Sequence, residues 1–265
     1  SGSVNAVTKS GTNELEGDFY VYNRNEDMVG DDANGNEPGV FTEDTMGFSL
    51  GGPIMEDNLF FYFNYEKFEQ VYPAFYGPDG SGATLEAYYV TQALVDRVRA
   101  SAQSLYGFDP GTYDTEQNNV SENTFVKLNW LLNDDHEVEV SYIDTTSNLV
   151  KVRGQPPYGF SLDSQWYDDK QGVEVMTSKL FSNWSDKFST QIVMSTRTQT
   201  DNQDPYRGDN FPSVAIAINN ADGSCTGSSN CTNPFRTIWG SARSGQYETL
   251  RFGQDQFRYN NEIIV

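Results

Sequence analysis

Two glutamates at alternate positions, Glu137 and Glu139, come nearest in this sequence to the spacing that catalysis needs. On an extended strand, residues two apart point to the same face, with their backbones about 6 to 7 Å apart. Two carboxyl groups at such a distance can act as acid and base in glycoside hydrolysis. The polar face of any strand offers the same spacing, so the pair favours a polar surface, and we expect no enzyme activity.

A zinc site or a catalytic triad is not expected either. The single histidine, His136, lies in the turn NDDH and far along the chain from both cysteines. Cys225 and Cys231 are six residues apart in the loop CTGSSNC, whose glycine and serine residues allow it to close. The pair predicts a disulfide formed in an oxidising compartment, with two unpaired thiols as the alternative.

An acidic loop at 25–44 invites a calcium interpretation. When an EF-hand pattern is aligned on Gly35, however, Gly30 falls at the first ligand position and Phe41 at the last, where the pattern needs carboxylates. A solvated acidic loop explains the composition better. We therefore expect no metal site and no cofactor.

Another long loop carries aromatic residues that could contact a ligand, namely Tyr158, Phe160, Trp166 and Tyr167. Aromatic rings exposed in a loop present the apolar surface that often marks a binding site. Packing within the loop is the alternative. We take Tyr158, Trp166 and Tyr167 as candidate ligand contacts.

The composition of the whole chain narrows the class of protein. Its formal net charge of -21 argues against nucleic-acid partners, which need clustered lysine and arginine. Mean hydropathy is -0.62, and no apolar run reaches the length of a transmembrane helix. Transmembrane strands need only alternate apolar positions over about 10 residues, so a β-barrel can have this composition. The 14% aromatic content fits a barrel with aromatic girdles or a sugar-binding β protein.

The segment at 59–68, LFFYFNYEKF, is the most aromatic predicted strand. Its alternation puts Phe61 and Phe63 on one face and Asn64 and Glu66 on the other. In a soluble sandwich, the apolar face packs against a second sheet. In a membrane barrel, it faces lipid and the polar face lines the lumen.

Further strands are predicted at 17–24, 46–54, 123–132, 137–142, 173–184 and 188–198, with an eighth in the segment from 247 onward. One helix is predicted at 83–105, within an excursion between two strands. Tight turns at 55–58, 133–136 and 185–187 alternate with long loops. In an up-and-down antiparallel sheet, this alternation places every tight turn at one end and every long loop at the other, as in outer-membrane barrels.

Several segments resemble TonB-dependent outer-membrane receptors of the Oar-like branch. SVNAVTKSGTNELEGDFYVYNRN is similar to the end of the plug domain and the first barrel strand of that family, and FSLGGPIMEDNLFFYFNYEKF to the strand, turn and strand that follow. YGFDPG, KLNWLLNDDHEVEVSY and FGQDQFRYNNE are similar to later parts of the same branch. The resemblance covers most of the chain, and the loops at 25–44 and 201–246 match least.

The resemblance implies a barrel of about 22 strands with an N-terminal plug. We expect residues 1–14 to be the end of the plug domain and 15–265 to be the N-terminal part of the barrel, incomplete in this chain. The signal peptide, the TonB box and the later strands are expected outside it. The resemblance also implies an unknown external ligand, contact with outer-membrane lipid, and energy supplied by the TonB complex through the plug. The location is then the outer membrane of a Gram-negative bacterium.

We therefore expect an all-β fold, an antiparallel up-and-down transmembrane β-barrel segment with long external loops, one of which carries a helix. Candidate ligand-binding residues of the lumen are the polar side chains of the predicted strands, Asn64, Glu66, Lys127, Asn129, Glu137, Glu139, Lys179, Gln191 and Arg197. The alternatives are a secreted all-β module that binds carbohydrate or peptide, and an extracellular glycosidase. Both require the face with Phe61 and Phe63 to pack against a second sheet, whereas the barrel leaves that face without protein cover.

Overall fold

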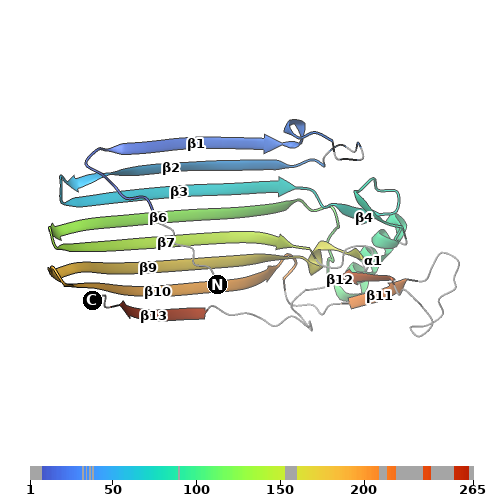
Figure 1. Ribbon diagram of the computed structural model, residues 1–265. Helices are drawn as coiled ribbons and strands as arrows, with labels where there is room; N and C mark the ends of the chain where they lie inside the picture. The colour runs from blue at the N-terminus through green and yellow to red at the C-terminus, as the bar shows by residue number, and fades with distance from the viewer. Residues whose placement is uncertain are drawn as a thin grey trace.

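The computed structural model describes residues 8–31, 33, 35, 37, 39–88, 90–152 and 160–208, together with the backbone of strands at 214–218, 235–239 and 254–262. One antiparallel sheet of eight strands dominates it (Figure 1). In spatial order the strands are β1 (Glu16–Asn25), β2 (Thr42–Met55), β3 (Leu59–Tyr72), β6 (Gln117–Asn133), β7 (His136–Lys151), β9 (Tyr167–Ser185), β10 (Phe188–Pro205) and β13 (Gln254–Glu262). Spatial order follows chain order, so the topology is up-and-down, and the described sheet is open because β1 and β13 do not pair.

Tight turns join the strands at one end of the sheet. Residues 56–58, 134–135 and 186–187 separate β2 from β3, β6 from β7 and β9 from β10. Asp57, in the first of these turns, has a φ of 59°, a left-handed conformation that aspartate tolerates in turns. The longer connections lie at the opposite end, on the right in Figure 1. The predicted alternation of tight and long connections is confirmed.

The strands extend further toward the long connections than the sequence pattern predicts. β7 continues to Lys151, although the predicted strand ends at 142, and β9 begins at Tyr167, although the predicted strand begins at 173. Beyond Tyr142 the alternate positions turn polar, so the pattern loses its strand signal. Backbone pairing does not depend on side-chain polarity, and it continues to the pair Lys151 and Tyr167.

The predicted helix is present and shorter than expected. α1 (Gln92–Tyr106) begins after Thr91, whose hydroxyl oxygen accepts the backbone N–H of Leu94 at 3.3 Å. It ends at Gly107, whose φ of 66° suits a residue without a side chain. The preceding residues, assigned to the helix by their spacing, instead form β5 (Leu85–Ala87), which pairs in parallel with β4 (Tyr76–Pro78).

The long connections build a folded cap, formed by residues 73–88, 90–116 and 160–166 with α1, β4 and β5 (Figure 1). The cap also holds η2 (Asp163–Gln165) and β8 (Phe160–Ser161), which joins β11 (Val214–Ile218) and β12 (Phe235–Trp239) in a small sheet. A further short helix, η1 (Glu26–Met28), follows β1. The main buried cluster of the described residues lies largely in the cap, around Tyr76, Phe160 and Trp166. No helix in the described ranges is both long and apolar enough to cross a membrane.

Candidate lumen site

One face of the eight-stranded sheet, here called the apolar face, carries large apolar side chains without protein cover. It consists of the residues that share the orientation of Phe61 on β3. On this face Phe19 is 71% exposed, Trp130 47% and Met194 48%. Across the described ranges, no second sheet or helix packs on it. The predicted absence of protein cover is confirmed, and the packing that a soluble sandwich needs is not found among these residues.

The apolar side chains of this face form a band that crosses the strands obliquely. Its edge nearest the cap falls at Val21, Met46, Tyr65, Val126, Tyr142, Met176 and Met194 on β1, β2, β3, β6, β7, β9 and β10. Following paired residues across the sheet from Val21 leads to Thr200 on β10, six residues nearer the cap than Met194.

This oblique course measures the tilt of the strands. Six residues over the six steps from β1 to β10 is one residue per strand. With about 3.3 Å per residue and about 4.8 Å between strands, a level band therefore requires a strand tilt of about 35°. Strands of outer-membrane barrels are tilted by about 35 to 45°. An oblique band with this slope is therefore expected when barrel strands are tilted and their apolar surface lies parallel to the plane of the membrane.

Aromatic residues mark the edge of the band near the tight turns. Trp130 and Trp184 are 47% and 58% exposed. Their indole N–H groups donate to Asn58 Oδ1 at 3.1 Å and to Thr190 Oγ1 at 2.9 Å. A ring facing outward with its polar atom paired at the turn end suits the interface between lipid and water.

The opposite face, here called the polar face, brings three predicted site residues together. Glu139 on β7 accepts from Lys127 on β6 and from Lys179 on β9, each at 2.8 Å and each through a different carboxylate oxygen. The Lys127 side chain is 4% exposed and that of Glu139 12%. This Glu139 cluster, formed by Lys127, Glu139 and Lys179, shares one carboxylate between two ammonium groups and so carries a net positive charge.

The N-terminal segment at 8–14 lies against this face. Lys127 Nζ donates to Thr8 Oγ1 at 3.2 Å, so the segment helps to cover the Glu139 cluster. A side chain at Gly11 would collide with the carbonyl oxygen of Phe61 and with the backbone of Gly52. Glycine at position 11 therefore lets the segment touch the backbone of the sheet.

A reciprocal pair of hydrogen bonds fixes the same segment at the tight-turn end. Asn13 Nδ2 donates to Asp57 Oδ1 at 2.6 Å, and the backbone N–H of Asp57 donates to Asn13 Oδ1 at 2.8 Å. A cavity of about 130 Å³ lies between the segment and the sheet, with Lys9, Glu14 and Asp18 among its lining residues. The segment and the wall thus enclose a small polar space on the polar face.

The comparison with protein families decides what this sheet is. The model of the outer membrane beta barrel domain matches residues 7–76, which include β1, β2 and β3. The chain is an outer-membrane β-barrel protein. No curated protein and no solved structure matches it significantly. The family match, the uncovered apolar face and its tilt place the sheet in the outer membrane, with the polar face toward the lumen.

The orientation of the barrel wall follows from its two ends. Outer-membrane barrels have short turns on the periplasmic side and longer loops outside the cell. The tight turn around Asp57 is therefore periplasmic, and the cap is external. The N-terminal segment is fixed near the periplasmic end and reaches Lys127 on the lumen side.

The remaining strand candidates all lie on the polar face, spread along the wall. Asn129 Nδ2 donates to Glu137 Oε1 at 3.1 Å beside the Glu139 cluster, and Gln191 lies in the row of paired residues that contains Glu137. Asn64 and Arg197 occupy one row but lie four strands apart, so the fold does not bring them together.

Glu66 has a partner that the sequence pattern did not identify. Its Oε2 accepts a hydrogen bond from Tyr20 OH at 2.6 Å. The two residues lie on either side of β2, where Gly47 is paired with both of them. A side chain at Gly47 would collide with the Tyr20 ring. The contact joins residues 46 apart, and no local pattern in the sequence suggests it.

The aromatic loop residues behave differently from the prediction. Phe160 and Trp166 are 0% exposed and Tyr167 is 6% exposed, so the expected exposed cluster is wrong for these three residues. Trp166 Nε1 donates to Tyr76 OH at 3.0 Å, and Tyr76 OH donates to the carbonyl oxygen of Ser161 at 2.8 Å. The rings fill the core of the cap because the β3–β6 connection folds over them. Burial raises the pKa of Tyr76 well above its usual range.

An ion pair that the sequence analysis missed closes the cap against the wall. Arg207 Nε and Nη2 donate to the two carboxylate oxygens of Asp163 at 2.9 and 3.0 Å, and the Asp163 side chain is 2% exposed. The hydrogen bond to Asp163 raises the pKa of Arg207. Burial, together with the negative charges of Asp168 and Asp163, raises the pKa of Tyr206 to about 12. The contact between Arg207 and Asp163 joins residues 44 apart and has no local signal in the sequence.

Three residues with predicted roles, Tyr158, Cys225 and Cys231, lie outside the described residues. The ligand contact of Tyr158 and the disulfide between the two cysteines stay predictions. Part of the acidic loop at 25–44 is described, and in it the backbone N–H of Phe41 donates to Glu26 Oε2 at 3.1 Å. This contact ties the two ends of that loop together.

Proposed function

We propose that this barrel protein is a TonB-dependent receptor that binds a ligand outside the cell and passes it into the periplasm. The observation that carries the proposal is the N-terminal segment, which lies on the lumen side of the wall before β1 begins. In receptors of this kind, an N-terminal plug fills the lumen and its end leads into the first strand. Residues 1–14 are, in this proposal, the end of that plug.

The burial of Lys127 supports a filled lumen. Its side chain is 4% exposed on a face that an open pore would leave in water. A lysine so far removed from water needs both an ion partner and protein cover. Glu139 supplies the partner, and the segment around Thr8 supplies part of the cover.

Ligand contact falls to polar-face residues outside the Glu139 cluster. Lys127, Glu139 and Lys179 hold one another, so a ligand would have to break their ion pairs. Arg197 is freer: it donates through Nη2 to Gln199, and its buried Nε has no hydrogen-bond partner in the described part of the chain. Arg197 and Gln191 on β10, with Asn64 on β3, are the proposed ligand contacts on the wall. Transport of this kind uses no catalytic residue and no cofactor.

The proposed partner is tested with the full-length protein. Purified protein in detergent is passed over the immobilised periplasmic domain of TonB, and retention is expected. A version lacking the residues that precede the barrel is the control and should not be retained. Equal retention of both, or of neither, contradicts the assignment.

The seating of the segment is tested separately. Thr8→Cys and Lys127→Cys are combined and treated with a short bifunctional thiol reagent in intact outer membranes. We expect a crosslink in this pair, and no crosslink when Thr8→Cys is combined with Thr198→Cys on the apolar face. If the protein binds TonB but this crosslink does not form, the receptor assignment is supported and the position of the N-terminal segment is contradicted.

A further inference from the structure

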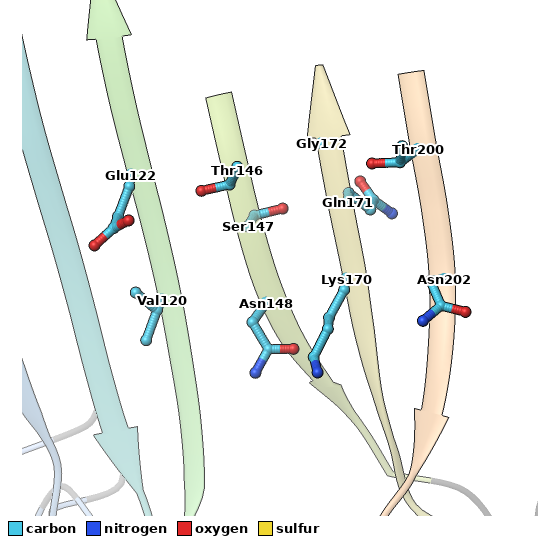
Figure 2. A pocket seen from close by; sticks show the side chains of 10 residues that line it. All are labelled: Val120, Glu122, Thr146, Ser147, Asn148, Lys170, Gln171, Gly172, Thr200 and Asn202. Atoms are coloured by element: carbon cyan, nitrogen blue, oxygen red, sulfur yellow. The ribbon is translucent and has the colours of Figure 1, made fainter. Parts of the chain in front are cut away.

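A pocket of about 360 Å³ opens on the same side of the sheet as the apolar face, across β6, β7, β9 and β10 (Figure 2). The side chains that line it and share the orientation of this face are mostly polar, and they include Glu122, Thr146, Asn148, Lys170, Thr200 and Asn202. Gly172, without a side chain, lies between its paired neighbours Thr146 and Thr200. The missing side chain leaves the hollow open.

The pocket lies beyond the apolar band on the external side. On β9 the band ends at Met176, and Gly172 is four residues nearer the cap. With about 3.3 Å per residue and a tilt of about 35°, Gly172 stands about 11 Å above the band edge. Lipid headgroup layers are about 5 to 8 Å thick. The pocket therefore lies above the headgroup of a simple phospholipid. The sugars of a glycolipid extend further from the membrane and can reach it.

The polar atoms of the pocket suit a ligand rich in hydroxyl groups. Asn148 Oδ1 is buried and has no hydrogen-bond partner within the described ranges, so it can accept a donor from a ligand. Thr146 and Thr200 place hydroxyl groups on either side of Gly172, and each can donate or accept. A hydroxyl group on each side of the hollow and an unpaired amide oxygen are partners that a sugar ring can use.

The charge around the pocket excludes an anionic ligand. Asp144, Glu174 and Asp168 share this side of the sheet near the pocket. The one cation among the lining residues, Lys170, is held by Asp204 at 2.7 Å. A phosphate or carboxylate would meet uncompensated negative charge, whereas a neutral sugar would not.

We propose that this pocket binds the neutral sugar headgroup of a glycolipid in the outer leaflet. The acyl chains of the lipid would lie along the apolar band below, next to Met176 and Tyr142. The site is separate from the lumen and does not depend on the proposed transport. Its role is to hold a specific lipid against the external part of the barrel wall.

The full-length protein is tested in nanodiscs that contain a diglucosyl diacylglycerol, phosphatidylglycerol and phosphatidylethanolamine. Lipid retained after extraction into mild detergent is identified by native mass spectrometry. The test variant combines Thr146→Val with Asn148→Leu, and a second variant, Gly172→Gln, fills the hollow without removing a polar group. The matched control combines Thr198→Val with Asn118→Leu, which lie on the same side of the sheet outside the pocket.

We expect the wild-type and the control to retain the diglucosyl lipid. Both test variants should retain it about tenfold less, the loss expected for about two hydrogen bonds. Heat-modifiable gel mobility shows that each variant is folded. The proposal is overturned if the test and control variants retain the diglucosyl lipid equally. It is also overturned if the wild-type protein retains phosphatidylglycerol as well as it retains the diglucosyl lipid. The free disaccharide is also added at the same concentration as the glycolipid. If it lowers the retention of the glycolipid, the pocket binds a soluble sugar and not specifically a lipid, and the proposal is overturned.

Discussion

Lys127 on β6 donates a hydrogen bond to Thr8, which lies 119 residues earlier in the chain, at 3.2 Å. The same ammonium group forms an ion pair with Glu139 at 2.8 Å. One side chain thus links the N-terminal segment to the charges of the barrel wall.

Replacing Lys127 by Met should destabilise the wall. Glu139 would keep only Lys179, whose side chain is 33% exposed, and would lose the partner that is buried with it. Removing one member of a buried ion pair costs about 3 to 5 kcal/mol, and we expect about 2 kcal/mol here because Lys179 remains. Unfolding by guanidinium in detergent micelles measures the loss. Lys187→Met, in the exposed β9–β10 turn, is the control and should change stability by less than about 0.5 kcal/mol.

Asn13→Ala should loosen the N-terminal segment without unfolding the barrel. It removes both hydrogen bonds with Asp57, and we expect a loss of about 1 to 2 kcal/mol in the local opening of the segment. Hydrogen exchange of residues 8–14 should become faster, while exchange in β6 and β7 stays unchanged. Asp57→Gly removes the Asp57 side chain but preserves the turn, because glycine adopts the positive φ at this position without strain. The variant therefore tests the side chain alone. If exchange is unaffected in both variants, the reciprocal pair does not hold the segment.

Arginine should be tolerated on one face of β10 and not on the other. Ile192 lies in the apolar band, and its neighbour Gln191 lies on the polar face. Ile192→Arg should cost about 2 to 4 kcal/mol in lipid vesicles, the cost of a cation at the lipid face. Gln191→Arg is the matched control, and it should cost less than about 1 kcal/mol because it faces the lumen, near Glu137. Equal costs would show that the assignment of the two faces is wrong.

The cap should lose stability in alkaline solution. Tyr206 has a pKa of about 12 in the folded protein, above the ordinary value near 10. Below pH 10 it is protonated in both states. Between pH 10 and 12 the unfolded chain loses this proton while the folded cap keeps it, so stability falls as the pH rises. Ultraviolet titration of tyrosinate should show one fewer late-titrating group in Tyr206→Phe than in the wild type.

The sheet itself could be predicted from local patterns. Alternation in LFFYFNYEKF and EVEVSY places Phe61 and Val138 on one face and Glu66 and Glu139 on the other, and the structure keeps those faces. The pattern fails where it turns polar, so the external ends of β7 and β9 were predicted too short. Backbone hydrogen bonds continue there with no help from apolar side chains.

The candidate site was predictable as a set of residues and not as a cluster. Lys127, Glu139 and Lys179 lie on three strands, and only their pairing in register brings the charges within 2.8 Å. Trp166 shows the reverse case. Its place in a loop suggested exposure, but the packing of Tyr76 and Phe160 around it made it part of a core.

The sequence by itself determined the strands, their two faces and the alternation of tight and long connections, because these depend on neighbours along the chain. The tertiary structure decided the tilt of the apolar band and the contact between Thr8 and Lys127. It also decided the burial of Asp163 against Arg207 and the pocket around Gly172. Each of these depends on which residues of distant strands lie opposite one another, and that register is set when the whole sheet forms.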